Sequence, residues 1–248
     1  MTAADLKRPA MRTDMLTLMS VATCVAVAVW IALAGPSGPV PIKMGLGGEV
    51  WRWGVRSQAA WLALSGGLVC GVVSVTCSLI SRNIRASSSL TRSLRLAQAI
   101  IGPVMAGADV YTAAAVFGWL KDPSLTAHLN MALMSMLIVI IGGLLGKTTA
   151  NPFIGLRFIW SLTSRRAWDR SNRLMGRLWF WGGLVGLGFA PFAPQPTGIE
   201  ALVGGVIVAE LIATLESWLV WRNDPERRTI IATVRSWGAL FNAEAAAS

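Results

Sequence analysis

Two carboxylates lie inside long apolar stretches of the chain, and they are the side chains whose setting most suggests chemistry. Asp109 lies midway along an apolar run at about residues 96–118, and Glu210 lies midway along another at about 198–221. A charge at membrane depth costs at least about 2.5–3.5 kcal/mol, so such a residue normally faces the protein interior and has a task. These buried carboxylates predict either a proton or cation path or hydrogen bonds between helices, and the sequence leaves both open.

Other catalytic patterns are missing from the sequence. The chain has one histidine, His128, and three cysteines within apolar runs, Cys24, Cys70 and Cys77. It contains no CxxC or HExxH motif, no phosphate-binding loop and no nucleophile elbow. We therefore expect no enzymatic activity, no metal site and no cofactor, and we expect the three thiols to be buried and reduced.

A basic segment at residues 147–177 separates two apolar runs. It contains one acid, Asp169, and three aromatic residues, Phe158, Trp160 and Trp168. Its seven cations are Lys147, Arg157, Arg165, Arg166, Arg170, Arg173 and Arg177. This composition is typical of a membrane surface, where cations face anionic headgroups and Trp rings lie at the interface. The segment either docks a partner or headgroup or anchors the neighbouring helices as an interfacial helix.

The composition indicates which elements must position these residues. The chain has 248 residues, of which 54% are hydrophobic and only 14% are charged, with a mean hydropathy of +0.58. Soluble domains are about a quarter charged, so this is an integral membrane protein. The net charge of +10 is spread over the loops between apolar runs, and no nucleic-acid-binding signature accompanies it. We therefore expect the lipid bilayer and its anionic headgroups as partners, and no nucleic acid.

The predicted fold is an all-α membrane protein, a six-transmembrane-helix bundle with both termini cytoplasmic. The first apolar run, residues 15–34, is about 20 residues long and predicts a span, since a signal-peptide core has about 7–15. Of the 22 Lys and Arg, 18 fall at the two ends and in the loops on their side, which follows the positive-inside rule. The expected order is a cytoplasmic tail (1–14), a helical hairpin (15–80) with an external Pro/Gly loop (35–56), transmembrane helices three and four (81–146), the basic cytoplasmic or interfacial segment (147–177), transmembrane helices five and six (178–221) and a cytoplasmic tail (222–248).

Glycine spacing predicts where helices approach one another. Gly67 and Gly71 form one GxxxG pair, and Gly142 and Gly146 form another. Such pairs allow a second helix backbone to come close. The loop at 35–56 holds three prolines and six glycines, so we expect no helix there.

Two segments resemble the SdpI family of bacterial integral membrane proteins. Residues 40–56 resemble the family's N-terminal motif, in which a proline (Pro41) precedes a Gly-Glu turn (Gly48-Glu49). Residues 141–176 resemble its C-terminal signature. The matching positions there are Gly142, Asn151-Pro152, Ile154-Gly155-Leu156-Arg157, Trp160-Ser161-Leu162, Trp168, Arg173 and Gly176. The sequence departs from the family pattern at Lys43, where a His is frequent, at Phe158-Ile159, where Thr-Pro is usual, and at Ser171-Asn172, where Thr-His is frequent.

The resemblance implies a bacterial inner (cytoplasmic) membrane protein that works by binding. Its role would be immunity to a secreted antimicrobial peptide, or signalling of that peptide to a cytoplasmic repressor, with a toxin peptide or other proteins as partners. The implied binding residues are Pro41, Gly48, Glu49, Asn151, Gly155, Arg157, Trp160, Trp168 and Arg173. Two other functions stay open: a structural accessory subunit of a larger membrane complex, and a proton-coupled transporter that uses Asp109 and Glu210.

Overall fold

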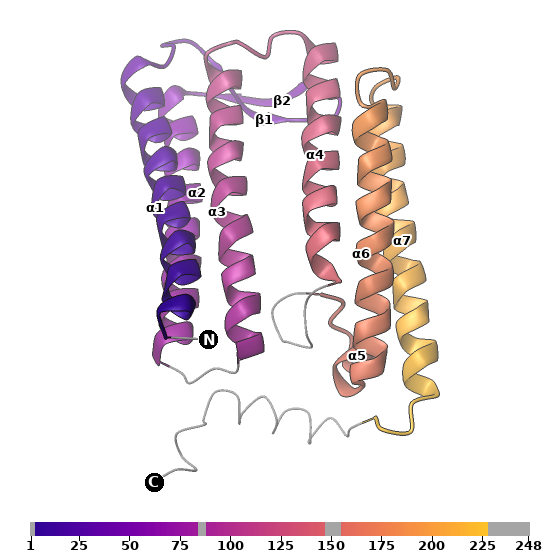
Figure 1. Ribbon diagram of the computed structural model, residues 1–248. Coiled ribbons are helices and arrows are strands. Elements are labelled where there is room, and N and C mark those ends of the chain that lie inside the picture. Colours follow the sequence, from indigo (N-terminus) through magenta and orange to yellow (C-terminus); the bar gives the residue numbers. More distant parts are fainter. Residues whose placement is uncertain (1–2, 84–87, 147–154, 228–248) are drawn as a thin grey trace. The chain divides into compact units, whose positions relative to one another are not determined.

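The computed structural model describes residues 3–83, 88–146 and 155–227, and that part of the chain is almost entirely helical (Figure 1). The elements in chain order are α1 (Ala3–Ala34), β1 (Val40–Met44), β2 (Val50–Gly54), α2 (Arg56–Asn83), α3 (Ser88–Val116), α4 (Pro123–Leu145), α5 (Ile159–Thr163), α6 (Arg165–Phe189) and α7 (Thr197–Arg222). The chain divides into two compact units. One comprises residues 1–83 and 94–123, and the other comprises residues 84–93 and 124–248.

Five helical segments within the described residues are long and apolar enough to cross a membrane. They are Thr13–Ala34, Arg56–Leu79, Leu94–Val116, Pro123–Leu145 and Thr197–Arg222. The protein is therefore a multi-pass helical membrane protein. The expected sixth span falls on α6, which has 25 residues but is not among these five. Six spans, and the side on which each terminus lies, stay predictions.

Helix α6 differs from the sequence analysis in where it begins. A boundary was predicted between residues 177 and 178, but one continuous helix runs from Arg165 to Phe189. The hydroxyl of Ser164 caps its start by accepting a hydrogen bond from the backbone N–H of Ala167 at 3.0 Å. No proline interrupts the helix. As a result, most of the basic segment forms the first half of a long helix.

In the first unit, α1 and α2 are joined by a short antiparallel hairpin, β1–β2. Val40 of β1 is buried in one core cluster with Ile31 of α1 and Ala63 of α2. The Arg56 guanidinium donates to the carbonyl of Gly35 at 3.1 Å, which ties the end of α1 to the start of α2. The predicted loop at 35–56 thus contains no helix before Arg56, as expected, but it folds as a paired sheet that covers the ends of the helices.

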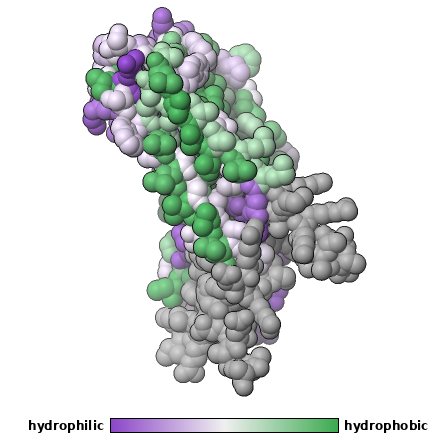
Figure 2. Space-filling model, turned by 90° about the vertical axis from the view of Figure 1, so that its left-hand side faces the viewer, coloured by the Kyte–Doolittle hydropathy of each residue, from purple (hydrophilic) through white to green (hydrophobic). Residues whose placement is uncertain are grey.

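One face of this first unit is shown in space-filling form in Figure 2. Green apolar side chains run along the helices, and more hydrophilic residues gather toward one end. Leu18 and Met19 of α1, and Trp61 and Leu68 of α2, are all at least 65% exposed. Large apolar side chains exposed in such numbers along helices fit a lipid-facing surface.

In the second unit, α4 packs against α6 through glycines. A Cβ atom added to Gly142 would lie 2.5 Å from the backbone nitrogen of Phe180, and one added to Gly176 would lie 2.7 Å from the carbonyl oxygen of Gly142. Any side chain at these positions would separate the helices. The close approach predicted at the Gly142 and Gly146 pair is therefore present. At the other pair, a Cβ on Gly67 would lie 2.9 Å from that of Cys24, whereas Gly71 has open space.

Candidate functional site

The segment before α5, α5 itself and the first half of α6 form a buried polar cluster around Asn172. Asn172 lies on α6 and is 1% exposed. Its Oδ1 accepts a hydrogen bond from the backbone N–H of Leu156 at 2.9 Å, and its Nδ2 donates to the carbonyl of Trp168 at 3.0 Å. The Ser161 hydroxyl donates to the carbonyl of Leu156 at 2.5 Å. We call Gly155, Leu156, Ser161, Trp168 and Asn172 the Asn172 cluster.

Gly155 belongs to this cluster because only glycine fits its position. Its φ is +115°, which L side chains rarely adopt. An added Cβ would also lie 2.5 Å from Asn172 Oδ1 and 2.8 Å from the ring of Trp168. Trp168 is fully buried. Two of the predicted binding residues therefore position the chain before α5, Trp168 from inside the protein and Gly155 from a half-buried position.

A second set of hydrogen bonds ties the start of α6 to the end of α7. The buried hydroxyl of Ser164 donates to the carboxylate of Asp224, which also accepts from the backbone N–H of Glu226 at 3.0 Å. Ser164, Asn172 and Asp224 were not predicted as functional residues. A serine just before a helix is a recognisable N-cap signal, and Asn172 lies in the family signature, but nothing local to residue 224 indicates its distant partner.

The remaining predicted residues of this region lie at or near the surface. The side chains of Arg157 and Arg173 are exposed, and that of Trp160 is half-buried. The indole of Trp160 stacks on Phe158 at 4.8 Å between ring centroids, and its buried Nε1 has no partner among the described residues. Asn151 lies outside the described residues. Arg157 thus lies at the surface and Trp160 is half-buried, while the Asn172 cluster holds the backbone beneath them.

The arginines of α6 form one exposed row. Arg166, Arg170, Arg173 and Arg177 are spaced i, i+4, i+7 and i+11, which places them on one face, and all four are exposed. Arg170 pairs with Glu216 of α7 at 3.0 Å. Arg166, Arg173 and Arg177 have no ion-pair or hydrogen-bond partner in the part of the chain described above.

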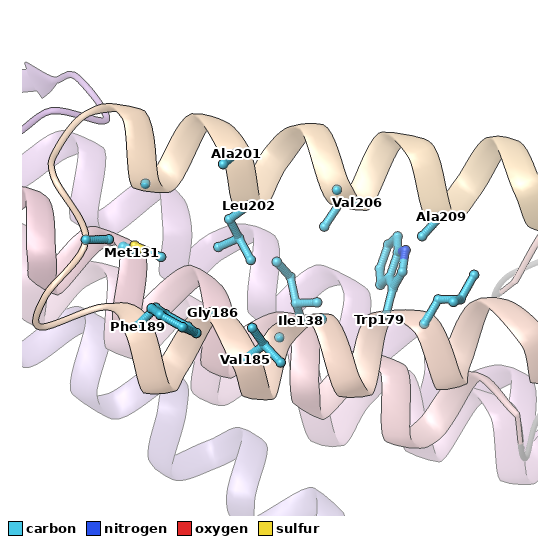
Figure 3. Close-up of a pocket in the computed structure, with 16 residues that line it drawn as sticks. Met131, Ile138, Trp179, Val185, Gly186, Phe189, Ala201, Leu202, Val206 and Ala209 are labelled. Carbon is cyan, nitrogen blue, oxygen red and sulfur yellow. The ribbon is translucent and has the colours of Figure 1, made fainter.

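An apolar cavity of about 380 Å³ lies between α4, α6 and α7 (Figure 3). Its walls include Ile138 of α4, Trp179 of α6 and Leu202 of α7. Glycines on α6 and α7, such as Gly182 and Gly205, leave the space open because they have no side chains. The Trp179 Nε1 atom is buried without a partner among the described residues. The volume lies in the range of small-molecule sites, and the lining suits an apolar ligand.

The predicted residues of the first unit belong to the hairpin. Pro41 of β1 pairs with Trp53 of β2, and Gly48 has a φ of +82° in the turn between the strands. The Glu49 carboxylate accepts from the indole Nε1 of Trp51 at 2.6 Å, and the Lys43 ammonium lies 5.1 Å above that ring. Pro41, Gly48 and Glu49 therefore have local structural roles in building the hairpin.

The two mid-helix carboxylates differ in their surroundings. Asp109 is 7% exposed, the thiol of Cys24 on α1 lies within hydrogen-bonding reach of it, and its Oδ2 has no partner among the described residues. Glu210 is exposed, contrary to the prediction that it is buried. The packed face of α7 follows Leu202, Ala209 and Ala213. Glu210 follows Ala209 by one residue, about 100° around the helix, and so points away from that face.

These features define the class: a multi-pass helical membrane protein whose C-terminal helices are joined by a buried polar cluster. Residues 147–220 match the model of the SdpI/YfhL protein family. This match confirms the resemblance to the family that the motifs indicated. The hairpin motif at 40–56 lies outside the matched residues. No curated protein and no solved structure matches the chain.

Proposed function

We propose that this protein acts by binding, as an inner-membrane protein of the SdpI type in antimicrobial-peptide immunity or in signalling the peptide's presence. The observation that carries the proposal is the apolar cavity, because helices α6 and α7, which form most of its wall, lie inside the family-matched residues 147–220. A peptide that acts on membranes presents apolar side chains, and these suit an apolar lining with one indole N–H as a polar contact.

The test is a protection assay in which only the cavity is changed. The chain is expressed in a bacterium that is sensitive to the secreted antimicrobial peptide against which the family's namesake protects its producer. Gly205→Leu places a side chain in the cavity, and the control Gly204→Leu adds the same side chain at a position that does not line the cavity. Both variants should fold, because an added Cβ meets nothing within 4 Å at either position. We expect wild type and Gly204→Leu to raise survival and Gly205→Leu to lose most of the effect. Equal survival of the two variants would remove the cavity from the proposal.

A second function, that of an accessory subunit, is favoured by Glu210. An exposed carboxylate midway along an apolar helix is costly in lipid and is normally covered by protein. A neighbouring membrane protein with a hydrogen-bond donor or a cation at that depth would cover it. Purification from native membranes decides between the two functions, because a subunit co-purifies with a stable larger assembly that Glu210→Lys disrupts.

A further inference from the structure

The exposed arginine row of α6 borders a hollow at the α4–α6 contact. The hollow has a volume of about 280 Å³, and its lining includes Arg173, Arg177, Phe180 and Trp181 of α6. Its other lining residues are glycines of the two helices, among them Gly143. A surface without side chains between two guanidinium groups leaves room for a ligand of the size of a phosphate group.

The two guanidinium groups are available to an anion. Arg173 and Arg177 are exposed and have neither an ion-pair nor a hydrogen-bond partner within the described ranges. They are spaced i, i+4, so their side chains lie on the same face one turn apart. The nearest acid on this helix, Asp169, lies one turn before Arg173 and forms no ion pair with it. Guanidinium groups bind phosphate oxygens through paired, charge-assisted hydrogen bonds.

The same face of α6 changes from basic to apolar along its length. Beyond Arg177 come Trp181, which is 62% exposed, and Leu184, which is 43% exposed. Arg177 lies 12 residues before the end of the helix at Phe189, about 18 Å at 1.5 Å per residue. A lipid in the adjoining leaflet has this same polarity, with its phosphate at the surface and its chains toward the bilayer centre.

At the matching depth, the exposed side of the neighbouring helix α7 is apolar apart from Glu210. The α6–α7 hairpin is antiparallel, and the Arg170–Glu216 pair fixes which levels correspond. Residues one to two turns above Glu216, such as Leu211 and Ile212, are therefore level with Arg173 and Arg177, and they are 63% and 47% exposed. Glu210 forms no ion pair with Arg173 or Arg177 within the described residues, so an anion from the membrane would satisfy the two arginines.

We propose that Arg173 and Arg177 form a binding site for an anionic phospholipid, with the phosphate between the two guanidinium groups and an acyl chain along Trp181 and Leu184. Among the described acids, Glu210 of α7 lies nearest to this level, and it pairs with neither arginine. The site is separate from the apolar cavity and does not depend on the antimicrobial role.

The experiment measures lipid binding to the full chain in detergent by native mass spectrometry, with phosphatidylglycerol compared with phosphatidylcholine. The wild-type protein is expected to prefer phosphatidylglycerol. The double variant Arg173→Gln with Arg177→Gln is expected to bind phosphatidylglycerol roughly tenfold or more weakly and to lose the preference. A control that removes equal charge, Arg165→Gln with Arg222→Gln, changes two exposed arginines that do not line the hollow and should keep the preference.

Two further arms separate this site from simpler explanations. Gly143→Leu keeps both arginines but fills the hollow, and its Cβ meets only the ring of Phe180 at 3.7 Å, so the variant should fold and lose lipid binding. Glycerol phosphate should fail to displace the lipid at millimolar concentration. The proposal is overturned if the Arg173/Arg177 variant keeps its preference, if the control loses it equally, or if Gly143→Leu binds like wild type. It is also overturned if glycerol phosphate competes fully, because that result would assign the site to a soluble phosphate compound.

Discussion

The Oδ1 atom of Asn172 accepts a hydrogen bond from the backbone N–H of Leu156 at 2.9 Å, across a sequence separation of 16 residues. This contact joins the segment before α5 to the middle of the basic half of α6. Both residues are buried, so neither group has water as an alternative partner. The bond therefore holds the loop that carries Arg157 in one position relative to α6.

Replacing Asn172 is expected to destabilise this end of the protein. Asn172→Leu leaves the buried N–H of Leu156 without its partner, which costs about 1–3 kcal/mol. Asn223→Leu is the control, because that exposed side chain makes one hydrogen bond, to the carbonyl of Leu219 at 3.1 Å. Thermal unfolding in detergent should show a clear loss for the first variant and little change for the second. Equal losses would mean that the buried bonds are unimportant.

Gly155→Ala is expected to be more damaging than alanine at a helix glycine. The positive φ costs about 1–3 kcal/mol for a residue with a Cβ, and the Cβ would also meet Asn172 Oδ1 at 2.5 Å. Gly204→Ala on α7 meets nothing within 4 Å and should be neutral or slightly stabilising. Denaturant or thermal unfolding of the two variants measures the difference. A stable Gly155→Ala protein would contradict the conformation described for this loop.

Arginine substitutions are expected to separate the family motif from general positive charge. Arg157 and Arg173 match the motif, whereas Arg165 and Arg166 are exposed on the same segment without matching it. Arg157→Ala with Arg173→Ala should therefore lower protection against the peptide several-fold more than Arg165→Ala with Arg166→Ala. Survival curves at equal expression level give the comparison. If both double variants lose protection equally, the segment acts through its charge alone.

Asp109 is expected to tolerate its amide but not a branched hydrocarbon. Asp109→Asn keeps the shape and the contact with Cys24, and it removes an unpaired carboxylate oxygen, so stability should be unchanged or higher. Asp109→Leu removes the partner of Cys24 and puts a larger apolar side chain in a buried position near Gly66, so a loss of about 1–3 kcal/mol is expected. Asp122→Asn, at an exposed position, is the control for the charge change. Equal damage from Asn and Leu would instead assign the carboxylate itself an essential structural role.

The topology prediction is tested by cysteine labelling from outside the cell in a variant that lacks the native cysteines. Cysteines at Ser37 and Ser124, both exposed, should react, and one at Asn223 should not, because six spans and the cation distribution place residue 223 inside. Ser164 is unsuitable for this experiment, since it is buried and caps α6. Outside labelling at Asn223 would show that α6 does not cross, which leaves five spans.

The sequence alone determined the features that depend on local composition and spacing. Long apolar runs predict membrane helices because length and hydropathy suffice, and Gly142 predicts a close helix contact because a missing side chain permits it wherever another helix lies. The prolines and glycines between residues 35 and 56 exclude a helix for an equally local reason. The motif residues alone indicate the resemblance to the SdpI family, because they can be read directly from the sequence.

Only the tertiary structure decided which faces of these helices are packed. Asp109 and Glu210 look alike in the sequence, yet one is buried and the other exposed, because periodicity defines a face but not the neighbour that covers it. The roles of Gly155 and Trp168 depend on Asn172, whose bond to Leu156 forms only when the loop folds back on α6. The bond from Ser164 to Asp224 joins residues 60 positions apart. Such contacts arise from the path of the chain in space, and no local pattern encodes that path.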